Sequence, residues 1–228
     1  MSKPKLAKFA ELKTFPNVLQ NFSFRNPSLT GCKGEKKDLK GKWNSNFFGN
    51  ENPIVLELGC GKGDYTVELA AHEAAKNFIG VDLKGSRIWT GAKRALELKL
   101  PNAAFVRTRI EMLPHFFAPS EVSEIWLTFP DPYPKRSKAN KRLISPFFLE
   151  KYRQFCRPGA VIHLKTDEPA LFHYAVQAAS LAPCKILTMI EDIYRNGPPA
   201  GELAIQTYYE KMHLEEGRTI RYLKFLLH

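Results

Sequence analysis

The chain has 228 residues, a length that suits one domain, or one domain with an extension, and that can bury a sizeable core without disulfide or metal staples. Its 44% hydrophobic and 25% charged residues are typical of a globular protein. Residues 1–30 contain no long apolar run, so we expect no signal peptide, no membrane span and a cytoplasmic location. The net charge of +11 indicates a polyanionic partner, and nucleic acid is the first candidate.

The positive charge is distributed unevenly along the chain. Residues 1–50 contain ten Lys and Arg against three Asp and Glu. A second basic cluster without any acid comprises Lys135, Arg136, Lys138, Lys141 and Arg142. Clustering in two places favours contact with a partner over charge that merely keeps the protein in solution.

The four cysteines, Cys32, Cys60, Cys156 and Cys184, are far apart in the sequence. None belongs to a CxxC pair, and no histidine spacing suggests zinc. We therefore expect reduced thiols and no metal site.

In chain order, residues 1–40 come first and mix Lys, Pro, Asn, Ser and Gly without clear periodicity, which predicts a loosely ordered basic arm. From Pro53 onward, short apolar runs alternate with helical patterns. The predicted strands are 54–58, 77–81, 103–106, 124–129 and 160–164, with two late strands at 185–190 and 219–227. The predicted helices are 64–75, 84–100, 147–155 and 169–181.

This alternation predicts an α/β fold with a Rossmann-like, doubly wound, mostly parallel sheet covered by helices on both faces, in three layers. Such sheets bind ligands at the carboxyl ends of their strands. The polar positions at those ends are the loop after Leu58, Asp82, Asp131 and Asp167, and we expect the chemistry there.

A glycine loop follows the first predicted strand of this sheet. Gly59, Gly61 and Gly63 alternate with other residues and let the backbone turn sharply close to a ligand. The helix after the loop directs its N–H groups and dipole at the same place. Asp82, at the end of the next strand, can accept hydrogen bonds from ribose hydroxyls. A turn without a ligand is the alternative reading, and the two acids at strand ends, Glu57 and Asp82, argue against it.

Two adenosine cofactors fit this pattern. A dinucleotide site prefers G-x-G-x-x-G, whereas this loop reads G-x-G-x-G and follows Glu57. A carboxylate there would repel a pyrophosphate but suits a ligand that carries a sulfonium and an ammonium group. S-adenosylmethionine carries both, so we favour it over NAD.

A proline-framed acid follows the fourth predicted strand. Three prolines surround Asp131 and Tyr133 and stiffen the loop that holds the carboxylate. A rigid acid at the carboxyl edge of a sheet suits catalysis, although an Asp beside Pro also commonly caps a turn. The basic cluster that comes next can neutralise phosphates, and Tyr133 could stack on a base or on the cofactor.

The chain resembles the bacterial tRNA (guanine-N7)-methyltransferases, a family of class I S-adenosylmethionine-dependent enzymes that methylate a guanine of the tRNA variable loop (guanine 46). The resemblance covers nearly all of residues 41–228, which it implies to be a class I methyltransferase domain after the 1–40 arm. Its most specific part is the proline-framed segment 129–135. It also includes segments 41–50, 57–63, 80–84, 163–167 and 207–210.

The resemblance implies roles for the matching residues. Glu57 and Asp82 would bind S-adenosylmethionine, and Asp131 would lie between cofactor and guanine as the catalytic candidate. Residues 137–142 would contact RNA. The substrate nucleotide would be bound by Lys135, Asp167, Thr207, Tyr208, Tyr209 and Glu210. The resemblance leaves open a monomer or a homodimer.

The sequence departs from the family pattern at three positions. Asp82 stands where many members have Glu, and Tyr133 where Trp is common. Arg109 stands where the family usually has an Asp beside the adenine, and an Arg cannot accept a hydrogen bond from the adenine amino group. Either the backbone holds the adenine there, or Glu111 substitutes.

Other readings of the sequence remain at this point. Residues 207–210 also fit a helix start with Thr207 as N-cap and Glu210 at the third helical position. A methyltransferase for a small molecule or a protein would share the glycine loop but leave the basic clusters unexplained. A non-catalytic RNA-binding protein would not need Glu57, Asp82 and Asp131.

Overall fold

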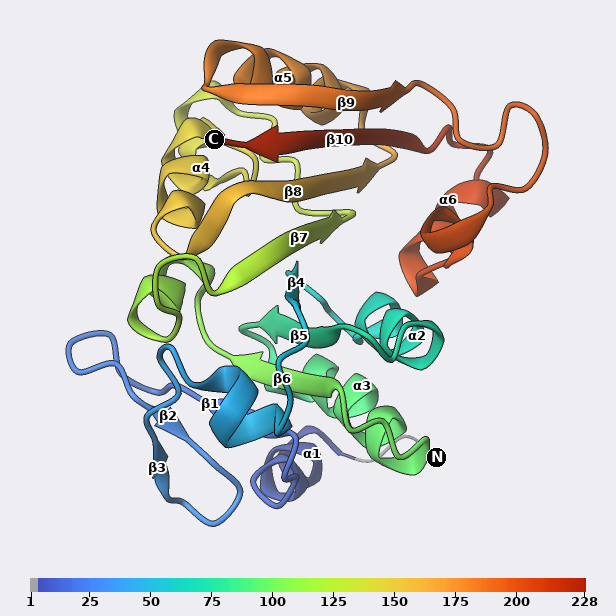
Figure 1. The fold of residues 1–228 in the computed structure, drawn as a ribbon. Helices are drawn as coiled ribbons and strands as arrows, with labels where there is room; N and C mark the ends of the chain where they lie inside the picture. Colours follow the sequence, from blue (N-terminus) through green and yellow to red (C-terminus); the bar gives the residue numbers. More distant parts are fainter. Residues whose placement is uncertain (1–3) are drawn as a thin grey trace.

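One mixed sheet organises the protein. The computed structural model describes residues 4–228, and ten strands form the sheet in the order β3-β2-β1-β6-β5-β4-β7-β8-β10-β9 (Figure 1). The strands are β1 (Val18–Gln20), β2 (Leu29–Thr30), β3 (Lys36–Lys37), β4 (Ile54–Leu58), β5 (Asn77–Asp82), β6 (Ala103–Arg107), β7 (Val122–Thr128), β8 (Cys156–Thr166), β9 (Cys184–Ile190) and β10 (Arg221–Leu227).

The centre of this sheet is parallel. Neighbours from β1 through β6, β5, β4 and β7 to β8 all pair in parallel, while β10 inserts antiparallel between β8 and β9. The doubly wound, mostly parallel sheet predicted from the sequence is therefore confirmed. The predicted strand starting at Ala160 begins earlier, at Cys156, because β8 continues through an irregularity against β7.

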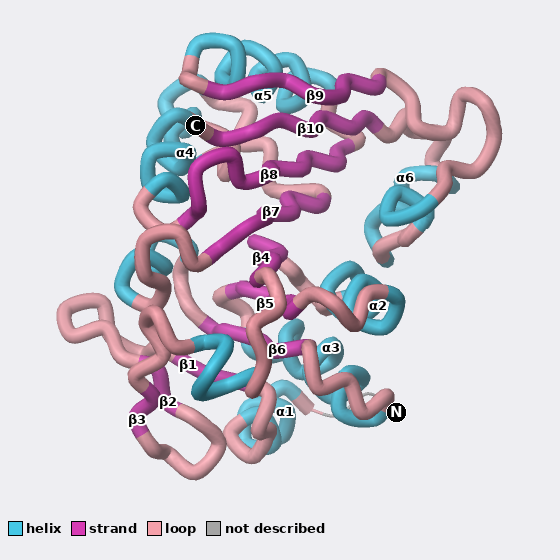
Figure 2. Tube along the Cα trace, viewed as in Figure 1, coloured by secondary structure: helices cyan, strands magenta, loops and turns pink. Residues whose placement is uncertain are grey.

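Helices cover both faces of the sheet, as the ribbon and the tube show (Figure 1, Figure 2). One apolar cluster packs the first three helices and the other packs the fourth and fifth, so the molecule has three layers. The helices are α1 (Lys5–Leu12), α2 (Asp64–His72), α3 (Gly85–Glu97), α4 (Pro146–Arg153), α5 (Pro169–Leu181) and α6 (Tyr208–Glu215).

The segment before the domain differs from the expected loose arm. Residues 4–40 contain α1 and three strands, and β1 extends the parallel sheet by pairing Val18 with Phe105. Val18 and Leu19 are buried at 1% exposure, and Leu12 is fully buried. Burial of these apolar side chains offsets the entropy of ordering the segment. The expectation for residues 1–3 lies outside the described residues.

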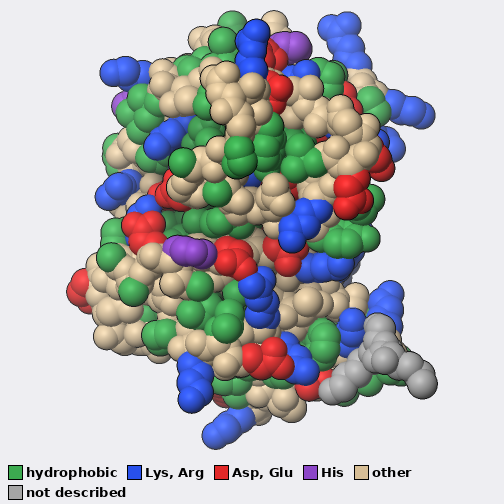
Figure 3. All heavy atoms as spheres, turned by 90° about the vertical axis from the view of Figure 1, so that its right-hand side faces the viewer, with side chains coloured by type: hydrophobic (Ala, Val, Ile, Leu, Met, Phe, Trp, Pro, Cys, Tyr) green, Lys and Arg blue, Asp and Glu red, His purple; other side chains and the backbone are tan. Residues whose placement is uncertain are grey.

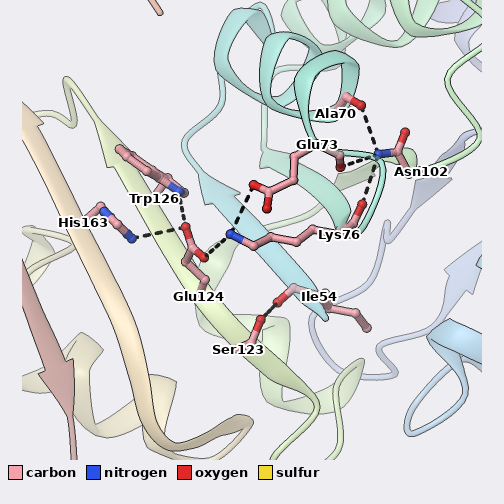
Figure 4. Close-up of polar contacts among 9 residues, drawn as sticks. All are labelled: Ile54, Ala70, Glu73, Lys76, Asn102, Ser123, Glu124, Trp126 and His163. Carbon is pink, nitrogen blue, oxygen red and sulfur yellow. Dashed lines mark hydrogen bonds and ion pairs between the residues drawn. The ribbon is translucent and has the colours of Figure 1, made fainter. Parts of the chain in front are cut away.

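A buried polar network joins strands at the centre of the molecule (Figure 4). The Glu124 carboxylate on β7 accepts hydrogen bonds from Trp126 Nε1 at 2.7 Å and Lys76 Nζ at 3.2 Å. His163 Nε2 on β8 lies 3.2 Å from the same carboxylate, and its Nδ1 lies 2.7 Å from the Tyr222 hydroxyl on β10. Burial opposes ionisation of Glu124, but these partners lower its pKa to about 2. Burial also lowers the pKa of His163, against the opposing effect of the Glu124 carboxylate.

No helix within residues 4–228 is long and apolar enough to cross a bilayer. In the same part of the chain, no group of three or more His, Cys, Asp or Glu side chains is arranged to hold a metal ion.

Candidate functional site

The glycine loop connects β4 to α2 at the carboxyl edge of the sheet. Gly59, Gly61 and Gly63 have φ values of 76°, 56° and 72°, which are left-handed and favour glycine. A Cβ on Gly63 would lie 2.6 Å from Phe105 Cε1, so this glycine permits close packing of the loop against β6. Gly59 and Gly61 line a cavity and Gly63 does not. Of the three predicted cofactor glycines, the first two therefore face the cavity.

This cavity has a volume of about 940 Å³ and lies across the carboxyl ends of the central strands. It brings together acids from several elements that the sequence separates widely. Of the predicted site residues, those that line it are Glu57, Gly59, Gly61, Asp82, Arg109, Asp131, Lys141, Asp167, Thr207, Tyr208 and Tyr209. Those outside its lining are Gly63, Lys135, Arg136, Lys138, Arg142 and Glu210.

Glu57 forms the floor of the cavity. Its carboxylate is 3% exposed and accepts hydrogen bonds from the Thr66 N–H at 2.8 Å, from the Thr66 hydroxyl, and from the Thr128 hydroxyl at 2.8 Å. Burial nevertheless raises the pKa of Glu57 to about 7, against the opposing effect of these donors. A cation bound above it would favour the ionised form.

Asp82 ends β5 at the rim of the same cavity. One carboxylate oxygen accepts from Gly61 N–H at 2.9 Å and the other from Lys84 N–H at 2.7 Å. These bonds fix the carboxylate and tie the glycine loop to β5. Each oxygen keeps a second lone pair with which it can accept a hydrogen bond from a ligand hydroxyl.

Asp131 lies exposed at the cavity wall, on the loop after β7. Among residues 4–228 no hydrogen bond or ion pair to its carboxylate occurs, which argues against a turn-capping role. The loop is strained on both sides of it, because Phe129 and Tyr133 have φ values of 50° and 42°. Strain of this kind in non-glycine residues is typical of functional sites and has to be held by surrounding contacts.

Arg142 supplies such contacts. Its guanidinium donates to Pro132 O at 3.0 Å and to Tyr133 O at 3.1 Å and 3.3 Å, and it lies 4.3 Å from the Tyr174 ring centre. The sequence suggested an RNA contact for this arginine. The structure places it behind the proline loop, where it braces the strained backbone.

The rest of the basic cluster is arranged differently. Lys135, Arg136 and Lys138 are exposed outside the cavity, and Lys141 lines it. On the face seen in Figure 3, Lys and Arg side chains are interspersed with Asp and Glu. Lys135, Arg136 and Lys138 place three exposed positive charges within four residues beside the cavity.

The helix α6 begins as the capping pattern predicts. Thr207 Oγ1 accepts a hydrogen bond from Glu210 N–H at 3.1 Å, and Tyr208 and Tyr209 line the cavity. The Glu210 side chain points elsewhere: it is fully buried and lies 2.7 Å from Lys165 Nζ, which is also fully buried. This ion pair fastens α6 to β8, and substrate binding by Glu210 stays a prediction.

Asp167 lines the cavity but is already paired. It accepts from Arg218 Nη1 at 2.8 Å and lies 3.6 Å from His213 Nε2. A substrate group that approached Asp167 would compete with these partners or join them.

Arg109 does not take the place of an adenine-side acid. Arg109 follows β6 and lines one end of the cavity. Its guanidinium carbon lies 4.3 Å from the centre of the Phe24 ring. Glu111 also lines the cavity. Of the two alternatives left by the sequence, substitution by Glu111 is therefore geometrically open.

The sequence pointed to no role for several cavity residues. Lys62 lies 3.6 Å from the Tyr208 ring centre, and Asp64 accepts from Tyr208 N–H at 3.2 Å. Both adjoin the glycine loop, which was a usable signal. His213 follows Tyr209 by one helical turn, which was a weaker one. Arg218 carries no signal in the sequence.

The comparisons with known proteins agree with this geometry. Residues 51–223 match the model of the family described as "Putative methyltransferase". A protein of Bacteroides thetaiotaomicron, named tRNA (guanine-N(7)-)-methyltransferase, is 48% identical over 100% of this chain and 87% of its own length. One of Christiangramia forsetii with the same name is 47% identical over 98% of both chains.

Solved structures share the fold at much lower identity. The 16S rRNA methyltransferase KamB superposes with a TM-score of 0.62 at 16% identity, over 85% of this chain and 96% of that one. A 16S rRNA (adenine(1408)-N(1))-methyltransferase from Catenulisporales acidiphilia gives 0.57 at 15% identity, over 85% and 93%. These likenesses show the fold alone.

Proposed function

Because the chain belongs to the family of the bacterial tRNA (guanine-N(7)-)-methyltransferases, we propose that it transfers a methyl group from S-adenosylmethionine to N7 of a guanine in tRNA. The observation that supports this most is the full-length identity of 48% with a tRNA (guanine-N(7)-)-methyltransferase, together with the acidic cavity at the carboxyl edge of the sheet. Guanine 46 of the variable loop is the proposed target.

The cavity fits the cofactor. Its buried acid, Glu57, lies where a sulfonium and an ammonium group would be favoured, and the fixed carboxylate of Asp82 can accept from ribose hydroxyls. Gly59 and Gly61 leave room for close approach of the backbone. When bound, S-adenosylmethionine supplies a methyl group on a positively charged sulfur.

The residues around Asp131 would then orient the guanine. N7 has an in-plane lone pair and no proton to lose, so the reaction needs no strong base and depends on positioning. The Asp131 carboxylate can accept hydrogen bonds from guanine N–H groups. It also interacts favourably with the positive charge that develops on the purine.

The exposed basic cluster supports an RNA partner. Lys135, Arg136, Lys138 and Lys141 lie beside or in the cavity without a carboxylate partner among the described residues, which suits contact with phosphates. We also propose that the enzyme acts in the cytoplasm, as a monomer or a homodimer.

Methylation of unmodified tRNA with labelled S-adenosylmethionine, followed by nucleoside analysis, tests the function. We expect 7-methylguanosine in tRNA, and with Asp131→Asn a kcat lower by about 100-fold at saturating tRNA and cofactor, roughly 2.7 kcal/mol. The variant should fold normally, because its side chain makes no hydrogen bond. Label in 16S rRNA or in small molecules but not in tRNA would contradict the function, and a variant within about threefold of wild type would contradict the role of Asp131.

A further inference from the structure

Two phenylalanine rings project into solvent beside the cofactor cavity. Phe22 is 63% exposed and Phe24 is 54% exposed. Such exposure is expensive for a large aromatic side chain unless a partner covers it. Phe22 and Phe24 are separated by a single residue, so they form a pair, whereas most exposed apolar side chains on a protein surface are isolated.

Their position follows from the pairing of β1 with β6. The chain continues past β1 alongside residues 107–109, since Asn21 N–H donates to Arg107 O at 2.9 Å and Asn21 Nδ2 donates to Thr108 Oγ1 at 3.2 Å. Thr108 and Arg109 line the cavity. The phenylalanines therefore stand beside the end of the cavity that Thr108 and Arg109 form, away from Asp131.

Each ring is accompanied by a guanidinium. The Arg107 guanidinium carbon lies 5.7 Å from the Phe22 ring centre, and that of Arg109 lies 4.3 Å from the Phe24 ring centre. Arg107 is held in place by Gln20 Oε1 at 3.1 Å and Leu83 O at 3.3 Å. Neither arginine has a carboxylate partner among residues 4–228, so their charges remain available.

This arrangement has the chemistry of a single-stranded nucleic acid site. Bases of any sequence stack on aromatic rings, and guanidinium groups near those rings neutralise the phosphates that connect the bases. Unpaired nucleotides offer these faces, whereas paired nucleotides hide them in the helix. The basic cluster at 135–141 lies beyond the Asp131 side of the cavity, so a bound strand would have positive charge at both ends of the cavity.

We propose that Phe22 and Phe24, backed by Arg107 and Arg109, form a stacking platform for unpaired nucleotides of the tRNA at the Arg109 end of the cavity that takes the target guanine. The platform rests on the proposed function, because the target guanine enters the same cavity. It also gives Arg109 a task that the adenine-side position of the family pattern did not explain.

Steady-state methylation of tRNA by single and double Phe→Ala variants tests the platform. Each substitution should raise the KM for tRNA by roughly fivefold or more, the range found when an aromatic ring that stacks on a base is removed. Since the rings do not touch the reacting atoms, kcat at saturating tRNA should stay within about threefold. Phe22→Trp and Phe24→Trp, which restore an aromatic face, should bring the KM back. Leu181→Ala, which removes an 81% exposed apolar side chain of α5 outside the cavity, is the matched control.

Calorimetry with S-adenosylhomocysteine distinguishes the platform from a cofactor contact. Unchanged cofactor affinity in the double variant supports an RNA role, and a loss of cofactor affinity with an unchanged KM for tRNA would overturn it. An unchanged KM in the double variant also overturns it, while the active wild type would keep the proposed function intact. Failure of the wild type to methylate tRNA would instead refute the function itself.

Discussion

At the residue scale, Glu57 combines burial with three hydrogen-bond donors, and burial prevails: the pKa of its carboxyl is raised to about 7. In the proposed function its partner is a cation. Below pH 7 the Glu57 carboxyl of the free protein is mostly protonated, and it must lose this proton before it can attract the cation. Above pH 7 the carboxyl is already ionised, and cation binding needs no proton release. The acid therefore links cofactor affinity to pH near neutrality.

We expect the affinity for S-adenosylhomocysteine, which keeps the ammonium group, to rise by up to about tenfold per pH unit as pH increases towards 7, and then to level off. Calorimetry between pH 5.5 and 8.5 measures this. Glu57→Gln should bind more weakly at pH 8 and show no such rise. Asp82→Asn should bind weakly but retain it, since Glu57 is still present. A wild type with flat affinity would show that no cation approaches Glu57.

At the scale of elements, the loop after β7 is held by Arg142 rather than by its own hydrogen bonds. Prolines remove backbone donors from the loop, so the Arg142 side chain binds its carbonyl groups from outside. Loss of this brace should allow Tyr133 to relax from its positive φ and move Asp131 away from the purine.

Arg142→Gln should therefore lower kcat by at least tenfold and leave the KM for tRNA nearly unchanged. Lys138 belongs to the same basic cluster, but it is exposed and does not hold the loop. Lys138→Gln should therefore have the opposite effect: it should raise the KM for tRNA and reduce the slope of log affinity against log salt concentration by about one unit. Parallel steady-state kinetics of the two variants measure both parameters. An Arg142→Gln variant that changes only the KM would return this arginine to the RNA-contact role first inferred from the sequence.

The sequence was informative about these elements wherever a signal was local. The glycine loop, the acid that ends β5 and the cap of α6 each depend on neighbours within a few residues, and each is found as predicted. The sequence could not predict the contacts of Arg142 and Glu210, because their partners, two loop carbonyls and Lys165, are defined only by the folded chain. A basic or acidic side chain near a motif looks the same in sequence whether it faces solvent or the interior.

At the scale of the whole molecule, the network around Glu124 joins β7 and β8 with the turn after α2 (Figure 4). Tyr222 extends it to β10. The ordinary pKa of a glutamate, 4.5, applies to the unfolded chain, and the folded pKa is about 2. Its contribution to stability is therefore complete above pH 4.5. It decreases as pH falls towards 2, because the unfolded chain binds the proton first.

The difference in unfolding free energy between wild type and Glu124→Gln should accordingly narrow by about 2 kcal/mol between pH 6 and pH 3. Urea unfolding at a series of pH values measures it. Glu150→Gln, at an exposed position of α4, provides a control whose unfolding free energy should differ little from that of the wild type at every pH. If the difference in unfolding free energy between wild type and Glu124→Gln did not change with pH, Glu124 would not be held ionised in the folded state.

The central sheet could be predicted because strands and helices alternate through most of residues 54–181. The beginning of the chain could not, because β1, β2 and β3 have only two or three residues each and leave no periodic pattern. Their placement depends on long-range pairing with β6, and the composition of residues 4–40 resembles that of a disordered segment. Apolar side chains such as Leu12, Val18 and Leu19, which are buried in the structure, were the local signs of burial.

The pairing of β1 with β6 also imposes an order in time. Gln20 and Arg107 are bonded across a sequence separation of 87 residues, so β1 cannot find its partner until β6 has been synthesised. At about 5–20 residues per second, roughly 4–17 seconds of synthesis separate the two. During that interval the beginning of the chain, with its exposed phenylalanines and its excess of lysine and arginine, is an unpaired cationic peptide beside an RNA-rich machine. The surface proposed for substrate recognition, Phe22 and Phe24 with the nearby positive charge, is therefore open to non-specific RNA binding before the protein has folded.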